Sequence, residues 1–202
     1  MKRSILLLTA TISFFLTQSQ INFGVKAGLN LANATGSGAT GSTTRANFHA
    51  GVLAQIPIND MLGIQPEIIY SGQGARASFA DGSGGTISGT HKLSYINVPV
   101  LFKYTSSSGF LVETGLQVGF LISAKASVSG INADEKNNFK STDFSWAFGV
   151  GFMSLMNIGI DARYNLGLTN IENSANGGST GIVKNSVIQI GAFYLFGEPK
   201  KK

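Results

Sequence analysis

The sequence contains no cysteine, so disulfide bonds, thiolate metal sites and a lipid-modified cysteine anchor are all excluded. Charged residues are also scarce: they make up 12% of the chain, against about 25% in typical soluble domains. No apolar run after residue 20 approaches the roughly 20 residues that a membrane-spanning helix requires. The chain beyond its first residues is therefore neither a disulfide-bonded scaffold nor a helical membrane protein.

Proline is rare and glycine is common, with 4 and 26 residues respectively in a chain of 202. Because glycine destabilises helices, this composition favours β structure. The length suffices for one substantial domain or one barrel. The formal net charge is +5, but Lys2, Arg3 and the terminal run 200–202 supply much of it, and we therefore expect no nucleic-acid partner.

The first 19 residues have the three parts of a secretory signal peptide. Lys2 and Arg3 provide the positive charge, and residues 5–16 form an apolar segment that is too short to span a membrane. Small residues at 17–19 allow cleavage before Gln20. The alternatives are an N-terminal anchor helix or a first strand, but the complete three-part pattern favours a cleaved signal.

The stretch from Ile158 to Ile171 alternates with a period of two. One face carries only apolar residues, and the other carries Asp161, Arg163 and Asn165 among glycines. Such alternation is typical of a long strand with one apolar and one polar face. Stretches of this kind recur along the chain, at 21–33, 47–58, 62–73, 91–104, 110–125, 143–155, 158–171 and 185–196.

Two kinds of barrel could be built from these strands. A soluble lipocalin-like barrel would turn its polar faces to water, but here those faces hold few charges and many glycines. In an outer-membrane barrel the apolar faces meet lipid and the polar faces line the lumen, where glycine makes room for larger polar neighbours. The connections also alternate short and long, like the periplasmic turns and extracellular loops of such barrels.

The sequence therefore predicts an all-β fold, an eight-stranded antiparallel up-and-down transmembrane β-barrel of the outer-membrane type. The expected organisation is a signal peptide over 1–19, the barrel over 20–197 and a charged tail over 198–202. We expect the barrel in the bacterial outer membrane, with both termini periplasmic and the long loops extracellular. Aromatic residues on the apolar faces predict two interfacial girdles: Phe48, Tyr70, Phe120, Phe144 and Trp146 towards the loops, and Phe23, Tyr104, Phe110, Phe152 and Phe196 towards the turns.

Three prolines fall inside the predicted strands, where a residue without an N–H group cannot complete the hydrogen-bond ladder. Pro57 can end its strand. Pro66 and Pro99 lie at similar heights on neighbouring strands, which predicts a bulge or locally weak pairing at that height.

Several segments together resemble the PorT-like outer-membrane β-barrel domain family over essentially the whole chain after the signal. They are FGVKAGLN from Phe23, the triplet Gln65-Pro66-Glu67, YINVPVLFKY from Tyr95, ETGLQVGFLISAK from Glu113, DFSWAFGVGF from Asp143 and RYNLGLTNI from Arg163. The resemblance implies an eight-stranded barrel in the outer membrane of a Gram-negative bacterium. It does not imply one activity, although the name-giving member is associated with a protein-secretion apparatus.

The polar faces carry charges of both signs that nearly balance, and an unpaired charge in a narrow lumen would cost several kcal/mol. We therefore predict a polar network that plugs the lumen, because small barrels are filled by side chains. The alternative is a gated or narrow pore whose selectivity those charges set. The charged members of the predicted lumen network are Lys26, Glu67, Lys103, Glu113, Asp161 and Arg163.

An outer-membrane lipid enzyme would need a nucleophile, a base and an orienting group, but the chain has only two histidines, His49 and His91. No spacing supports a catalytic triad, and no His/Asp/Glu cluster suggests a metal site. We expect a non-catalytic protein without cofactor or metal, in a structural or interaction role. The alternatives are a small channel, or a component of a secretion or envelope-assembly apparatus. The expected partners are outer-membrane lipids and an envelope or secretion protein, with the barrel itself monomeric.

Overall fold

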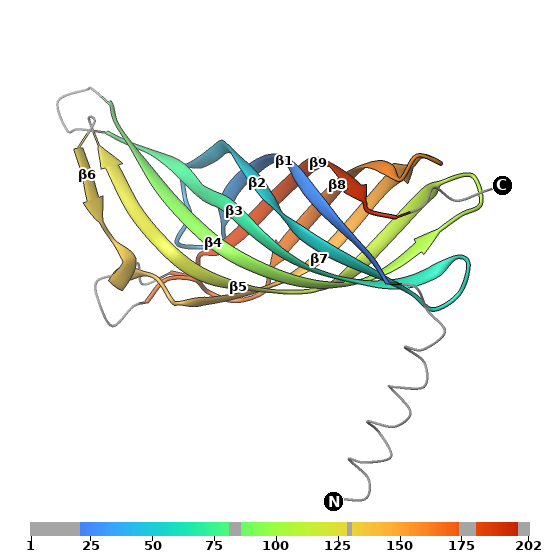
Figure 1. The fold of residues 1–202 in the computed structure, drawn as a ribbon. Helices are drawn as coiled ribbons and strands as arrows, with labels where there is room; N and C mark the ends of the chain where they lie inside the picture. Colours follow the sequence, from blue (N-terminus) through green and yellow to red (C-terminus); the bar gives the residue numbers. More distant parts are fainter. Residues whose placement is uncertain (1–20, 81–85, 129–130, 174–180, 198–202) are drawn as a thin grey trace, which may run out of the picture.

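The computed structural model describes residues 21–80, 86–128, 131–173 and 181–197, and the predicted signal peptide and charged tail lie outside these ranges. Eight of its nine strands form a closed antiparallel barrel in which each strand pairs with its neighbour along the chain and β9 pairs with β1 (Figure 1). The predicted fold class is therefore confirmed. The barrel strands are β1 (Asn22–Thr35), β2 (Ser42–Pro57), β3 (Leu62–Ala80), β4 (Thr86–Thr105), β5 (Phe110–Val128), β7 (Thr142–Met153), β8 (Ile158–Gly167) and β9 (Lys184–Leu195).

The two ends of the barrel differ. Short connections at 58–61, 106–109 and 154–157 lie at one end, which we call the turn end, and there β1 begins and β9 ends. The other end, the loop end, also carries the short strand β6 (Ile131–Asp134), which pairs with β5, and the 3-10 helix η1 (Lys136–Asn138). No helix in the described part of the chain is long and apolar enough to cross a membrane.

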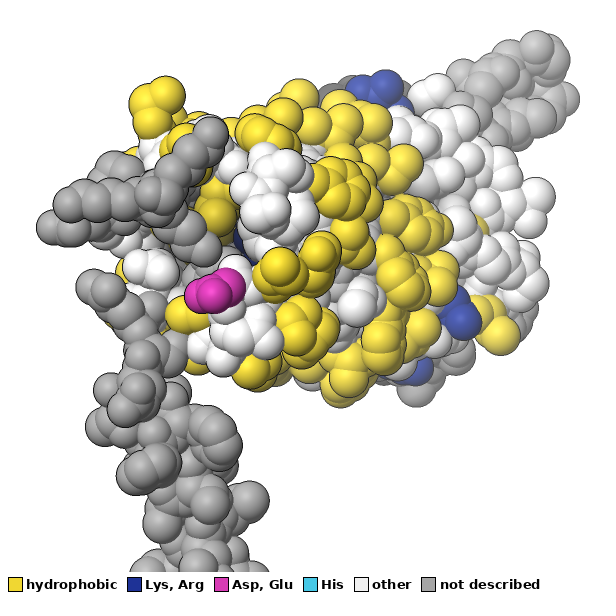
Figure 2. All heavy atoms as spheres, turned by 90° about the vertical axis from the view of Figure 1, so that its right-hand side faces the viewer, with side chains coloured by type: hydrophobic (Ala, Val, Ile, Leu, Met, Phe, Trp, Pro, Cys, Tyr) yellow, Lys and Arg dark blue, Asp and Glu magenta, His cyan; other side chains and the backbone are white. Residues whose placement is uncertain are grey.

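The wall of the barrel is apolar outside and largely polar inside. Exposed hydrophobic side chains such as Phe23 and Ile160 cover the outer face, whereas Lys26 and Asp161 on the same strands are buried. Hydrophobic side chains dominate much of the face in Figure 2, and only a few charged side chains interrupt them. Because a strand alternates its side chains between its two faces, this inversion follows directly from the period-two pattern of the sequence.

The strands extend further at the loop end than the sequence indicates. Segment 74–90 reads as a long loop, yet β3 continues to Ala80 and β4 begins at Thr86. The predicted strand at 158–171 is instead too long, since β8 ends at Gly167. The apolar alternation that marks a strand in sequence is needed only where one face is buried and the other meets an apolar environment. Beyond that zone a ladder can continue through glycine, serine and threonine without any such pattern.

We call the loop-end extension formed by 75–80, 86–93, 123–128 and β6 the outer ribbon, because it continues beyond the last pair of β5 with β7. It curves away from the rest of the barrel in Figure 1. Register shifts fall at its base, between Thr44 and His49 in β2 and between Ser94 and Tyr95 in β4. Gly74, with φ +105°, lies at the same height, where a side chain would meet the His91 carbonyl. Bulges and a left-handed glycine are the devices that bend a sheet.

The prolines weaken pairing without changing the register. In the β2–β3 ladder the positions around Pro66 are unpaired, and in the β3–β4 ladder the positions around Pro99 are unpaired. The register is the same on both sides of each gap, so the expected local weakness is confirmed and the bulges lie elsewhere. Pro57 ends β2, as predicted.

Candidate functional site

The lumen begins at the turn end with an apolar layer. The side chains in this layer alternate inward from four strands and form one buried cluster: Leu53, Leu111, Met153, Phe193 and Leu195. The sequence predicted a polar lumen, and this layer corrects that picture, since the interior is apolar where it meets the turns. An apolar layer of this kind excludes water from the polar groups above it.

The second layer is an ion network centred on Arg163 of β8. The two terminal nitrogens of its guanidinium donate to the two carboxylate oxygens of Glu67, each at 2.9 Å, and Nε donates to Glu113 Oε1 at 2.9 Å. Glu67 comes from β3, which lies across the barrel from β8 in the strand order. Arg163 therefore connects opposite walls through a bidentate contact, which is geometrically the most specific that arginine makes.

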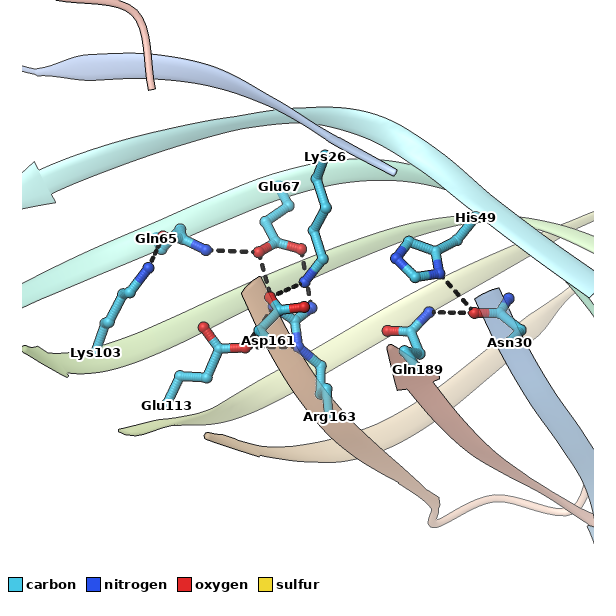
Figure 3. A network of polar contacts seen from close by, with 10 residues as sticks. All are labelled: Lys26, Asn30, His49, Gln65, Glu67, Lys103, Glu113, Asp161, Arg163 and Gln189. Carbon is cyan, nitrogen blue, oxygen red and sulfur yellow. Dashed lines mark hydrogen bonds and ion pairs between the residues drawn. The ribbon is translucent and has the colours of Figure 1, made fainter. Parts of the chain in front are cut away.

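The remaining charges join this centre from other strands (Figure 3). Lys26 pairs with Asp161, whose carboxylate lies 3.9 Å from Arg163 Nη2. Lys103 Nζ donates to Gln65 Oε1 at 2.9 Å, and Gln65 Nε2 donates to Glu67 Oε1 at 2.7 Å. Lys103 also lies 4.5 Å from the ring centre of Phe193, which places the network directly above the apolar layer.

All six charged residues predicted to face the lumen are buried there, and the structure brings them together. Three are cationic and three are anionic, so the network carries no formal net charge. Lys103 differs from the other two cations because it reaches the carboxylates through Gln65, whereas Lys26 and Arg163 pair with them directly. Buried charges are tolerated only when paired in this way.

Glycines on the inner face provide the room that these side chains occupy. A Cβ atom at Gly149 would lie 2.8 Å from the Glu113 carboxylate oxygen, closer than real contacts allow. A Cβ atom at Gly159 would collide with the ring of Phe193. Inward glycines therefore make room for larger neighbours, as predicted: Gly149 for the polar Glu113 and Gly159 for the apolar Phe193.

A third layer consists of neutral polar groups around Asn30 (Figure 3). Its amide nitrogen donates to Ser71 Oγ and to the Gly72 carbonyl, both at 2.9 Å, while its oxygen accepts from Gln189 at 3.0 Å. His49 Nδ1 lies 2.8 Å from the same oxygen. His49 is one of the two histidines that the sequence analysis weighed against an enzyme, and the structure places it in this amide network. Asn30 was not among the predicted network residues, although it shares the inner face with Lys26.

A fourth layer holds a buried carboxylate that the sequence prediction missed. Asp143 accepts hydrogen bonds from Asn185 Nδ2 at 2.8 Å and from Thr169 Oγ1 at 2.9 Å. Asn185 Nδ2 also lies 3.4 Å from the hydroxyl of Tyr95. The sequence could have identified Asp143, because it lies on the same face of its strand as Ser145, whereas Phe144 and Trp146 face outward.

An apolar cluster closes the loop end of the lumen. Ile171 and Val183 come from the connection between β8 and β9, and the Ile171 N–H donates to the Val183 carbonyl at 2.9 Å. The Lys140 N–H also donates to the Ile171 carbonyl, at 2.7 Å, which ties a second loop segment to the first. The buried members of this cluster are Leu93, Tyr95, Leu121, Ala124, Ile171 and Val183.

Above this cluster lies a cavity of about 340 Å³, which we call the cup. Its walls are mainly small and apolar, and Phe139 packs partly buried against the cluster below. His91 lies on the wall, with Nδ1 2.9 Å from Glu135 and its ring edge-on to Phe139 at 6.3 Å. The described side chains include no group of three or more His, Asp or Glu residues that could hold a metal ion. The lining residues are Ala34, Gly38, Ala39, Thr40, Ser42, Gly74, Ala75, Ala77, His91, Leu93, Phe139, Ile171, Glu172, Val183 and Asn185.

Solved structures with this architecture include several bacterial surface proteins. Neisserial surface protein A (NspA) is 20% identical, with 86% of this chain and 97% of that chain covered and a TM-score of 0.52. Ail of Yersinia pestis, in complex with the heparin analogue sucrose octasulfate, is also 20% identical, with 88% and 99% covered and a TM-score of 0.47. OprG of Pseudomonas aeruginosa is 17% identical, with 88% and 97% covered and a TM-score of 0.46.

At 20% identity the likeness to NspA establishes the fold alone. No curated protein matches the sequence. The family described as outer membrane protein beta-barrel domain, however, matches residues 16–173. The chain therefore belongs to the family of outer membrane protein β-barrel domains, and its place is the bacterial outer membrane.

Proposed function

We propose that the chain is a closed, non-conducting barrel that acts through its loop end, in a structural or interaction role without catalysis. The observation that supports this proposal is the filling of the lumen by successive layers of side chains. Apolar clusters lie near both ends, and two polar layers and the buried carboxylate lie between them. A lumen filled in this way matches a small barrel whose interior is just wide enough for its own side chains.

The contact of Arg163 with Glu67 and Glu113 argues most strongly against conduction. An ion passing through the barrel would have to displace a guanidinium that reaches across the lumen and is held there by these two carboxylates. Removing one partner of such a buried pair costs about 3–5 kcal/mol, because the other charge is left uncompensated. A path past this layer would therefore be populated rarely.

The proposal includes an orientation and a set of partners. Both termini lie in the periplasm and the long loops outside the cell, as in other outer-membrane barrels. Lipids contact the apolar outer face of the barrel, the barrel is monomeric, and an envelope protein binds at its loop end. The narrower resemblance to PorT-like proteins stays a prediction, as does the secretion role that it implies.

Single-channel recording tests the closed lumen. Folded protein, purified in detergent and checked by its heat-dependent mobility in gels, is added to planar lipid bilayers, with an open porin in parallel. We expect no steady current steps from this protein under conditions in which the porin conducts. Reproducible steps of one size from the folded barrel would overturn the proposal and favour the channel alternative.

Gentle extraction from native outer membranes, followed by mass spectrometry of co-purifying proteins, tests the interaction role. A reproducible partner that is lost when the loop end is altered would support it. A partner that instead depends on the turn end and belongs to a secretion apparatus would replace this proposal with the secretion alternative.

A further inference from the structure

The cup has the size and lining of a small-molecule site. Its volume of about 340 Å³ lies at the lower end of the range of about 300–1,000 Å³ that is usual for ligand pockets, which often occur in the mouths of β-barrels. Four alanines line it, so its walls present little side-chain bulk: Ala34, Ala39, Ala75 and Ala77. Leu93, Phe139, Ile171 and Val183 complete an apolar surface that fits the body of an apolar molecule.

Asn185 offers a hydrogen-bond acceptor at the cup. Asn185 is buried, and its amide nitrogen is used by Asp143, but its amide oxygen accepts no hydrogen bond from any described residue. Glu172 is also part of the lining, and the described lining contains no lysine or arginine. A ligand group that points to the Asn185 oxygen must therefore donate a hydrogen bond.

Asp143 adds a negative charge next to Asn185, whose amide nitrogen donates to it. Its oxygens accept from Asn185 and Thr169, and within the described ranges no lysine, arginine or histidine forms an ion pair with it. This isolation contrasts with the second layer, where each carboxylate has a cationic partner. A buried carboxylate without a countercharge is costly, and a cation bound in the cup would supply the missing one.

We propose that the cup binds a small amphipathic amine, with the ammonium group at Asn185 and the apolar body against the alanine-lined wall. This inference deepens the proposed action through the loop end and rests on it. An aliphatic or aromatic carboxylate of the same shape would be repelled by Asp143. An uncharged alcohol would keep the hydrogen bond to Asn185 but would lose the charge attraction.

Three indole probes of similar shape test the charge preference: tryptamine, tryptophol and indole-3-propionate. The protein is placed in phosphatidylcholine nanodiscs, and binding is followed by NMR of methyl groups. Leu93, Ile171 and Val183 report on the cup, whereas Ile160 and Ile190 on the outer face report partition into lipid. We expect tryptamine to shift the cup methyls and to bind about tenfold more tightly than tryptophol, as a charge-assisted hydrogen bond would cause.

Two variants separate charge from shape. Asp143→Asn should lower the affinity for tryptamine about tenfold and leave that for tryptophol nearly unchanged, because it removes the charge but keeps the size of the side chain. Ala39→Trp should abolish binding of both probes by filling the cup. Ala133→Trp is its matched control, since Ala133 is exposed on β6 and does not line the cup.

Equal binding of all three probes, tighter binding of indole-3-propionate, or shifts confined to the outer-face methyls would each overturn the inference. Binding of tryptamine that survives both Asp143→Asn and Ala39→Trp would overturn it as well. None of these results bears on conductance, so a failure of the ligand inference remains distinguishable from a failure of the closed-barrel proposal.

Discussion

The lumen of the barrel and the outer ribbon use the same kinds of residue under different constraints. In the lumen, the side chains of Arg163 and Glu67 are at most 1% exposed and form a bidentate pair. At the ribbon, His91 pairs with Glu135, which directly follows β6, and the two side chains are 41% and 21% exposed. Water can solvate the second pair but not the first. Breaking an ion pair should therefore change the free energy of unfolding much more in the lumen than at the ribbon.

The space around glycine residues also differs between the barrel and the ribbon. Gly159 in the barrel faces the ring of Phe193, and a Cβ atom there has no room. Gly89 in the ribbon has Val128 as its nearest neighbour, and a Cβ atom there would lie 3.6 Å from it, an ordinary contact distance. The barrel interior therefore specifies its residues by packing and pairing, whereas the ribbon depends mainly on its backbone ladder.

Replacing the central arginine should have the largest effect. Arg163→Met leaves Glu67 and Glu113 buried without their main cation, and we expect the free energy of unfolding to fall by about 3–5 kcal/mol. Urea unfolding in detergent micelles measures this change. The single tryptophan, Trp146, lies on the outer face and reports the transition through its fluorescence.

Two further variants show whether the loss comes from the unpaired carboxylates. Adding Glu67→Gln and Glu113→Gln to Arg163→Met should recover most of the lost stability, because the orphaned charges are then gone. Arg76→Met, at an exposed arginine of the ribbon, should change stability by no more than about 0.5 kcal/mol. Equal losses at Arg163 and Arg76 would contradict the contrast between the two regions.

The period-two pattern predicts the strands of the barrel and the inward set of charges because both depend on which face a side chain occupies. It places Lys26, Glu67 and Arg163 inside, and they are inside. It cannot predict that Arg163 pairs with Glu67, since that contact joins strands on opposite walls and depends on the stagger of the closed sheet. The pairing of particular charges is a property of the barrel and not of any one strand.

The pattern fails in the ribbon and at the loop end for the opposite reason. Segment 86–90 has strand structure without clear alternation of apolar residues, since backbone pairing with β3 holds it in place. The cup brings Ala34, Ala75 and Val183 together from three different strands or loops, and none of them looks functional in sequence. The inward position of Asp143 could have been predicted from the period-two pattern. Its lack of a cationic partner among the described residues is visible only once the neighbouring strands are in place.

Adding one methyl group should have an intermediate effect in the barrel and almost none in the ribbon. Gly159→Ala forces a Cβ atom towards the ring of Phe193, and we expect a loss of about 1–3 kcal/mol from overpacking. Gly89→Ala should stay within about 0.5 kcal/mol of the parent protein. The same urea titration measures both variants.

A second substitution identifies the source of the Gly159→Ala effect. Phe193→Leu makes space at the colliding ring, so the double variant should be less destabilised than the sum of the two single changes. Simple additivity would show that the cost of Gly159→Ala does not arise at Phe193. A loss at Gly89 as large as that at Gly159 would show that the ribbon is packed as tightly as the barrel.

The smallest effect should come from the partly exposed pair formed by His91, on the wall of the cup, and Glu135. A double-mutant cycle with His91→Gln and Glu135→Gln should give a coupling energy below about 1 kcal/mol, which added salt reduces further. The corresponding cycle with Lys26→Met and Asp161→Asn should give a larger value with little salt dependence, because water and ions do not reach that pair. Equal couplings would mean that burial does not separate the two regions. If the coupling at the cup is as small as expected, the contact between His91 and Glu135 contributes little to the stability of the barrel, in contrast to the buried pair of Lys26 and Asp161.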